Sequence, residues 1–316
     1  MSETKTLFTL DVDKQSWEHI FQSIDAFERV IKAIFERHGL PLTTVENLTS
    51  GTNAVFKVGD KVVKIFAPVE SGYYDTDYFD IEKEAQMNVN SRHVASPRLL
   101  HEGVIEDKYV FRYIVMDFVM GQEAGQALEG YTRQQKQDFA AQIRDITRKI
   151  NICIQPAAIP VLTIDTCLTN HRWTWDGFPT SFCDDRAAVI QGLNFDNLVY
   201  VHGDLTAENM IIRGDGTVCL IDFADSIIAP YYYEWLPIVF GLFRCCPVMM
   251  AAYFGEYRND DFFDVLKKAV LIHEFGAGSV RELCEDNGVD IGTLVSVSQL
   301  RALIRDICLQ AAAQPA

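Results

Sequence analysis

Residues 199–226 read VYVHGDLTAENMIIRGDGTVCLIDFADS and place a histidine, several carboxylates and an asparagine between short β-branched runs. The apolar runs predict short strands at 198–201, 210–212 and 218–221, the last two joined by the turn RGDG. A hairpin brings its two ends together, so Asn209 at its start and Asp222 just past its end should lie side by side. Asp204, on the loop that enters the hairpin, should be within reach of both.

These three side chains carry the chemistry of a phosphoryl-transfer site. The Asn209 amide oxygen and the Asp222 carboxylate are hard oxygen ligands of the kind that Mg²⁺ takes, with water and phosphate filling the other positions. Asp204, a carboxylate not used by the metal, can accept a proton from a substrate hydroxyl. Phosphoryl transfer depends mostly on positioning and charge neutralisation, which a metal clamp and a base supply.

The chain has 316 residues, which suits two domains better than one small core. Its pattern changes near 116–121. The hydrophobic spacing before this point predicts a helix at 16–38, a hairpin through Gly59-Asp60, a helix at about 80–90 and strands within 96–103 and 108–119. Beyond it the sequence predicts a helix near 132–152 and mostly helices at 231–310. We therefore expect domains at 1–118 and 119–316.

The overall charge and the cysteine spacing narrow the class of partner. With a net charge of −16 the surface would repel a phosphate backbone, which argues against nucleic acid as a partner, whereas a cationic small molecule would be attracted. The eight cysteines form no CxxC pair, so neither a zinc site nor a secreted disulfide framework is expected.

Membrane insertion and secretion are not expected from the sequence. The N-terminus lacks a basic stretch followed by an apolar core, and the apolar stretch at 231–254 is interrupted by Glu234, Arg244 and two prolines. We expect a cytoplasmic protein with no membrane partner, and no obligate protein partner is evident.

The spacing of the central motif resembles that of a known family. His202 and Asp204 are followed by four residues and then Asn209, and Asp222-Phe223 begins 13 residues later. HGDLTAEN and IDFAD resemble the signature of the aminoglycoside phosphotransferase and choline kinase group, and the resemblance extends over about 43–257. It implies an α+β, protein-kinase-like fold with a small β-rich lobe and a larger helical lobe. It also implies transfer of the γ-phosphate of ATP, with Mg²⁺, to a hydroxyl of a small molecule.

The resemblance further implies a strand lysine on the ATP phosphates and a helix glutamate that holds it. Lys64 in KVVKIF is the preferred lysine, with Lys57 and Lys61 as alternatives. Because related antibiotic kinases use the second glutamate of a similar E-x-E pair, the implied partner is Glu84. Glu82 would then be solvated surface.

Two more segments receive a nucleotide-binding role by resemblance. The loop TSGTNAVF would offer the backbone N–H groups of Ser50, Gly51 and Thr52 to phosphate, although it has a single glycine. The link MDFVMGQ would bind adenine through the Asp117 carbonyl and the Val119 N–H.

The motif also departs from that of protein kinases. Ala224 replaces the glycine of Asp-Phe-Gly and resists positive φ, so no switch of the Asp-Phe-Gly type is expected. His202 is expected to hold the loop rather than to carry a proton. Asp225 would either contact the substrate or cap a turn.

The substrate is expected against acidic and aromatic side chains of the helical lobe, which suits an amine-bearing hydroxyl compound. Aminoglycosides, choline-like amines, amino sugars and other hydroxylated metabolites all remain open. The candidate residues are Asp184, Asp185, Asp225, Tyr232, Glu234 and Trp235.

Two other functions compete with the small-molecule kinase. A protein kinase needs an activation segment, but the chain passes from Asp222 to the apolar YYYEWLPIVF within about eight residues, which leaves little room. A non-catalytic nucleotide-binding module is the other alternative, and the presence of every catalytic residue type argues against it.

Overall fold

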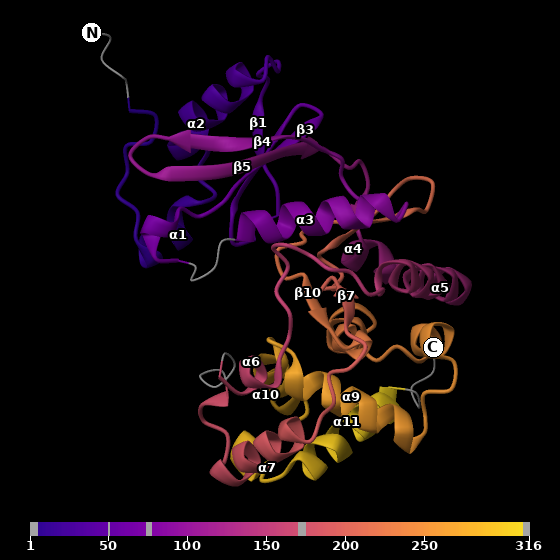
Figure 1. The fold of residues 1–316 in the computed structure, drawn as a ribbon. Coiled ribbons are helices and arrows are strands. Elements are labelled where there is room, and N and C mark those ends of the chain that lie inside the picture. Colours follow the sequence, from indigo (N-terminus) through magenta and orange to yellow (C-terminus); the bar gives the residue numbers. More distant parts are fainter. Residues whose placement is uncertain (1–5, 50, 74–77, 170–174, 312–316) are drawn as a thin grey trace. The chain divides into compact units, whose positions relative to one another are not determined.

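The computed structural model describes residues 6–49, 51–73, 78–169 and 175–311. The chain divides into two compact units, residues 1–120 and 121–316 (Figure 1). The boundary lies two residues beyond the position expected from the change in sequence pattern.

The first unit contains a five-stranded antiparallel sheet in the order β1-β2-β3-β5-β4. The hairpin through Gly59-Asp60 forms as expected, with Val58 opposite Lys61. The elements of this unit are α1 Lys14–Ile20, α2 Ile24–Arg37, β1 Val45–Asn47, β2 Ala54–Val58, β3 Lys61–Ile65, η1 Val69–Ser71, α3 Tyr78–Ser91, β4 Leu99–Glu106 and β5 Val110–Asp117.

Helices cover both faces of this sheet (Figure 1). Along β3, Val63 packs into a core with α1 and α2, whereas Val62 packs into a second cluster with Phe79 of α3. Because successive strand residues point to opposite faces, Lys64 lies on the α3 side. The strand period therefore decides which helix can supply a partner for this lysine.

The N-terminal segment forms two helices where the sequence predicted one at 16–38. The helix α1 ends at Ile20, and Ser23 caps α2 by accepting a hydrogen bond from the Ala26 N–H (3.3 Å). The three- and four-residue apolar spacing runs through the break, because both helices bury their faces against the same core. The apolar periodicity therefore could not reveal that a new helix begins after Ser23.

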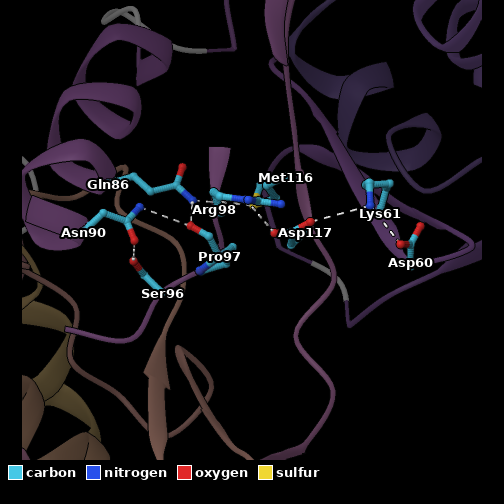
Figure 2. A network of polar contacts seen from close by, with 9 residues as sticks. All are labelled: Asp60, Lys61, Gln86, Asn90, Ser96, Pro97, Arg98, Met116 and Asp117. Atoms are coloured by element: carbon cyan, nitrogen blue, oxygen red, sulfur yellow. Dashed lines mark hydrogen bonds and ion pairs between the residues drawn. The ribbon is translucent and has the colours of Figure 1, made fainter. Parts of the chain in front are cut away.

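The end of β5 is held by polar contacts with both of its neighbours, as Figure 2 shows. The Asp117 carboxylate accepts a hydrogen bond from Arg98 Nε (3.1 Å) and lies 3.6 Å from Lys61 Nζ. The Phe118 N–H donates to the Asp60 carbonyl (2.9 Å). Gln86 of α3 donates to the Pro97 carbonyl (2.8 Å). These contacts fix the position of residues 117–118, where the chain leaves the sheet.

The second unit is mostly helical and contains two small antiparallel sheets, β6-β8-β9 and β10-β7. Its elements are β6 Gln122–Glu123, α4 Ala124–Glu129, α5 Arg133–Ile150, α6 Ile164–Thr169, α7 Thr180–Gln191, β7 Val199–Val201, β8 Met210–Ile212, β9 Val218–Leu220, β10 Ile227–Ala229, η3 Tyr231–Glu234, the π-helix η4 Pro237–Leu242, α8 Pro247–Phe254, α9 Asp260–Ile272, α10 Gly276–Asp286, η5 Ile291–Thr293 and α11 Val297–Ala311.

The apolar stretch at 231–254 is divided among η3, η4 and α8. Within the described residues, no helix combines the length and the apolar character needed to cross a bilayer. All eight cysteines carry free thiols.

Candidate active site

The loop after β7 brings Asp204 and Asn209 into direct contact. Asn209 Nδ2 donates to Asp204 Oδ2 (2.7 Å) and to the Asp204 backbone carbonyl (3.0 Å). These bonds use the amide nitrogen and leave the Asn209 amide oxygen as the atom able to face a cation. The contact also holds the Asp204 carboxylate in one orientation.

Asp222 reaches the same site from the other strand of the hairpin. The Ile221 N–H donates to the Asn209 carbonyl (3.0 Å), so the β8-β9 ladder continues to the residue that precedes Asp222. Asp222 has a left-handed backbone (φ 58°), which is uncommon outside glycine and often found at functional sites. Burial, and secondarily the Asp222 charge, raise the pKa of Asp204 to about 6. A base with this pKa is ionised at neutral pH and can still take up a proton.

His202 is a buried part of the loop. Its Nδ1 accepts a hydrogen bond from the Asp204 N–H (3.4 Å), and its Nε2 lies 3.2 Å from the Ile221 carbonyl. Burial lowers the pKa of His202 to about 4, which keeps the ring neutral. This geometry suits the expected structural role.

Gly203 is held by two buried side chains that are distant in sequence. Its N–H donates to Glu234 Oε1 (2.7 Å), and His273 Nε2 lies 3.0 Å from its carbonyl. Because His273 Nδ1 accepts from the Phe275 N–H (3.1 Å), the Nε2 atom is the donor to Gly203. Gly203 has φ +85°, and an added Cβ would lie 2.0 Å from the Asp225 carbonyl oxygen, so only glycine fits.

Glu234 was expected to contact the substrate, but it is 1% exposed and does not line the cavity that opens beside Asp204. Burial raises its pKa to about 8. Glu234 supports the loop that carries Asp204, a role that its position 31 residues along the chain did not reveal.

The strand lysine pairs with a different glutamate from the one expected. Lys64 Nζ lies 2.6 Å from Glu82 Oε2, and the two side chains are only 5% and 3% exposed. Glu84 is half-buried, so both the choice of Glu84 as partner and the reading of Glu82 as solvated surface were wrong.

The spacing along α3 explains this outcome. Glu82 lies on the buried stripe that also contains Ala85, Gln86 and Val89, three, four and seven residues further on. Glu84 is about 200° away around the helix. The sequence therefore held the signal for the correct partner, and the resemblance to other kinases overrode it.

Of the predicted phosphate loop, Gly51 and Thr52 are described and exposed, whereas Ser50 lies outside the described residues. Asp117 and Val119, expected to bind adenine through their backbones, lie at the braced end of β5. All of these residues belong to the first unit.

A cavity of about 870 Å³ opens beside Asp204 in the second unit. On one wall, α10 turns Ser279, Glu282, Leu283 and Asp286 toward it, the spacing of one helix face. Six carboxylates but only one basic side chain line this cavity, which we call the acidic cavity. The carboxylates are Glu123, Glu129, Asp204, Glu208, Glu282 and Asp286, and the basic side chain is Arg244.

None of the acidic residues proposed from sequence for substrate binding lines the acidic cavity. Asp185 Oδ2 accepts a hydrogen bond from the Val297 N–H (2.8 Å) at the start of α11, which is a capping role. Asp184 is exposed on α7, and Asp225 is half-buried with its carbonyl against Gly203. The cavity residues were missed because they come from separate elements, although the α10 spacing alone could have suggested Glu282 and Asp286.

The donor atoms at Asn209 and Asp222 fit a small hard cation. One amide oxygen and one carboxylate are the few protein ligands that Mg²⁺ uses when phosphate and water supply the rest. Within the described residues, no cluster of three or more histidine, cysteine or acidic side chains forms a cage for a metal ion. This donor set is consistent with a metal that binds together with a phosphate ligand.

Comparisons with known proteins identify the family of the chain. Residues 44–254, more than half of the chain, match the phosphotransferase enzyme family. Curated protein sequences gave no match.

Similar solved structures include three small-molecule kinases. The GDP and kanamycin complex of an APH(2″) enzyme has a TM-score of 0.60 and 18% identity, covering 90% of this chain and 96% of the other. The ADP and hygromycin B complex of a thermostable APH(4)-Ia mutant has a TM-score of 0.57 and 14% identity, covering 90% and 99%. Choline kinase LicA from Streptococcus pneumoniae has a TM-score of 0.54 and 14% identity, covering 88% and 98%.

These likenesses establish the protein-kinase-like fold, with a sheet-containing first unit and a helical second unit. The chain belongs to the phosphotransferase enzyme family.

Proposed function

We propose that the protein transfers the γ-phosphate of ATP, with Mg²⁺, to a hydroxyl group of an amine-bearing small molecule. The observation that carries this proposal is the position of Asp204, a carboxylate with a pKa raised to about 6, on the wall of an acidic cavity. A base next to a space large enough for a small molecule is what hydroxyl phosphorylation requires.

Each side chain has a defined task in this reaction. Asp204 accepts the proton from the acceptor hydroxyl while the hydroxyl oxygen forms a bond to the γ-phosphorus, and the bond to the β,γ-bridging oxygen breaks to release ADP. Asn209 fixes the carboxylate of Asp204 through its 2.7 Å hydrogen bond. Lys64, held by Glu82, supplies the positive charge for the nucleotide phosphates.

Asn209 and Asp222 would hold Mg²⁺, which would neutralise charge on the phosphate oxygens. The remaining coordination positions suit those oxygens and water. Gly51, Thr52, Asp117 and Val119 are proposed to contact the nucleotide by backbone atoms, as the family resemblance implies.

The acidic cavity supports a cationic acceptor. Its six carboxylates face one arginine, and in the described chain Glu282 and Asp286 make no ion pair with another residue. Two similar enzymes are named for complexes with kanamycin or hygromycin B, and a third is named as a choline kinase, which supports acceptors of this class.

The test is ADP release from Mg·ATP by the full chain in the presence of kanamycin, hygromycin B, choline, glucosamine or the neutral polyol sorbitol. We expect stimulation by at least one amine-bearing compound and none by sorbitol, with the signal lost in Asp204→Asn and on chelation of Mg²⁺. ATP binding without stimulation by any acceptor would contradict the proposal and favour a non-catalytic nucleotide-binding module.

A second experiment tests the acidic cavity. Glu282→Gln and Asp286→Asn should each raise KM for the amine-bearing acceptor about three- to ten-fold, because each removes one partly solvated charge contact. Glu285→Gln on the same helix does not line the cavity and should keep the parental KM. If all three variants keep the parental KM, the acceptor does not bind in the acidic cavity.

A further inference from the structure

The N-terminal segment, residues 6–43, lies outside the family match at 44–254 and is nevertheless part of the first unit's core. Its aromatic side chains pack edge-to-face and tilted against one another and against the sheet. The members that are 0% exposed are Phe8, Trp17, Phe27, Val30, Ile31 and Ile34.

The beginning of this segment is tied to the turn between β4 and β5. The Leu7 and Phe8 N–H groups both donate to Asp107 Oδ2, at 3.0 and 2.7 Å. The Val12 N–H donates to the Tyr109 hydroxyl (2.9 Å). These bonds fix the start of α1 relative to the sheet.

Trp17 on α1 contacts the predicted phosphate loop directly. Its Nε1–H donates to the Thr52 carbonyl (3.0 Å), 35 residues along the chain. The indole itself cannot easily move, because it packs edge-to-face on Phe27 (5.9 Å between ring centroids) and stacks with Phe21 (6.4 Å). A buried aromatic group thus holds one carbonyl of an otherwise exposed loop.

The orientation of this carbonyl sets the orientation of the next N–H. The peptide bond is planar and trans, so the Asn53 N–H points away from the indole when the Thr52 carbonyl points toward it. No residue in the described ranges accepts a hydrogen bond from the Asn53 N–H, whereas the Asn53 side chain is fixed by the Ala67 N–H (3.3 Å). An unpaired N–H on a 3% exposed residue is costly unless a ligand accepts from it.

We propose that Trp17 is a positioning residue for the nucleotide loop, holding the Thr52–Asn53 peptide so that the Asn53 N–H can donate to a phosphate oxygen. This inference rests on the proposed function, because that function assigns the loop to the nucleotide. Trp17 acts through Thr52 and makes the N-terminal segment part of the nucleotide site.

The test compares ADP binding in the presence of Mg²⁺ for the full chain and two variants. Trp17→Phe keeps an aromatic ring and loses the N–H, and should raise the Kd for ADP about three- to ten-fold. Phe8→Leu disturbs the same core without touching the loop and should change the Kd less than two-fold. Acceptor KM should stay constant in both, since the acidic cavity belongs to the second unit.

Hydrogen exchange of the amides in 51–56 gives a readout independent of nucleotide. It should be faster in Trp17→Phe than in Phe8→Leu. If Trp17→Phe does not fold, benzothienylalanine at position 17 removes the N–H and keeps the shape of the indole.

Equal Kd values for the parent and Trp17→Phe, or equal losses in both variants, would overturn the inference. Absence of ADP binding by the parent protein would overturn the proposed function and the nucleotide role of Trp17 together. In that case the exchange data would still show whether Trp17 holds the loop, so the two failures can be told apart.

Discussion

The two units place their charged groups in opposite ways. In the first unit, Lys64 and Glu82 form a 2.6 Å ion pair that is almost fully buried between a strand and a helix. In the second unit, Asp204 and Asn209 sit on a loop beside an open acidic cavity, next to the left-handed Asp222. In the first unit, the lysine charge is neutralised by a paired glutamate. In the second unit, several carboxylates line one cavity with a single arginine.

This difference reflects what each group must do. A buried cation needs a partner, because desolvation without one costs several kcal/mol, so the helix must deliver Glu82 to Lys64. A catalytic base such as Asp204 benefits from the absence of a cationic partner, because burial and a neighbouring carboxylate then raise its pKa toward neutrality. We therefore expect stability and nucleotide binding to be lost when the Lys64–Glu82 pair is broken, and the rate of phosphate transfer to be lost when the Asp204 charge is removed.

The largest effect is expected from the second unit. Asp204→Asn should lower kcat by about 10²–10⁴, because it removes the proton acceptor and keeps the side-chain shape. Nucleotide affinity should be unchanged, which equilibrium binding of ADP measures. Asp215→Asn in the exposed turn between β8 and β9 is the matched control and should retain full activity. A kcat loss below ten-fold in Asp204→Asn would remove Asp204 from the chemistry.

The next effect tests the ion pair of the first unit. Glu82→Gln leaves the Lys64 charge buried without a carboxylate, so it should lower stability by about 3–5 kcal/mol and weaken ADP binding at least ten-fold. Glu84→Gln on the same helix should change the Kd for ADP by less than two-fold and the unfolding free energy by less than about 0.5 kcal/mol. Denaturant unfolding and ADP titration would measure both. If the Glu84 variant were the more damaged of the two, the pairing seen here would be incorrect.

The pH dependence of the reaction should reveal the raised pKa of Asp204. The carboxylate must be ionised to accept a proton, so kcat/KM for the acceptor should fall as pH drops below about 6, by up to ten-fold per unit. The measurement is a rate profile between pH 4.5 and 8. If the residual activity of Asp204→Asn shows the same fall in kcat/KM below pH 6, the fall is caused by the titration of another group.

The last prediction concerns the pH dependence of stability that Glu234, the buried support of the loop, should cause. Its folded pKa of about 8 lies above the usual 4.5, so the folded state binds the extra proton. The stability that this proton provides is complete below pH 4.5 and is lost as pH rises through about 8. The unfolding free energy should therefore fall by up to about 1.4 kcal/mol per pH unit in this window.

Glu234→Gln should remove this slope while still accepting from the Gly203 N–H. Thermal unfolding from pH 5 to 8.5 would show it, with exposed Glu285→Gln as the control that keeps the slope. Parallel curves for the parent and Glu234→Gln would mean that Glu234 is ionised in the folded protein.

The parts of the site that sequence reasoning predicted lie close together along the chain. The hairpin that carries Asn209 and Asp222 follows from apolar runs and a glycine turn, which local spacing encodes. The correct glutamate on α3 was also encoded, as a three- and four-residue stripe through Glu82, but the position of a similar glutamate in other kinases was given more weight. Local periodicity was in this case the better guide.

Sequence by itself predicted the two hairpins at 54–65 and 210–220 and the family motif, and it named the groups proposed to bind a metal or take a proton. Only the tertiary structure showed that Glu234 and His273, 31 and 70 residues further along the chain, form hydrogen bonds with the Gly203 backbone. It also decided that Trp17 holds Thr52 and that Glu282 and Asp286 line the same cavity as Asp204. Burial and hydrogen-bond partners at such separations depend on how the elements pack, and no short-range spacing records that packing.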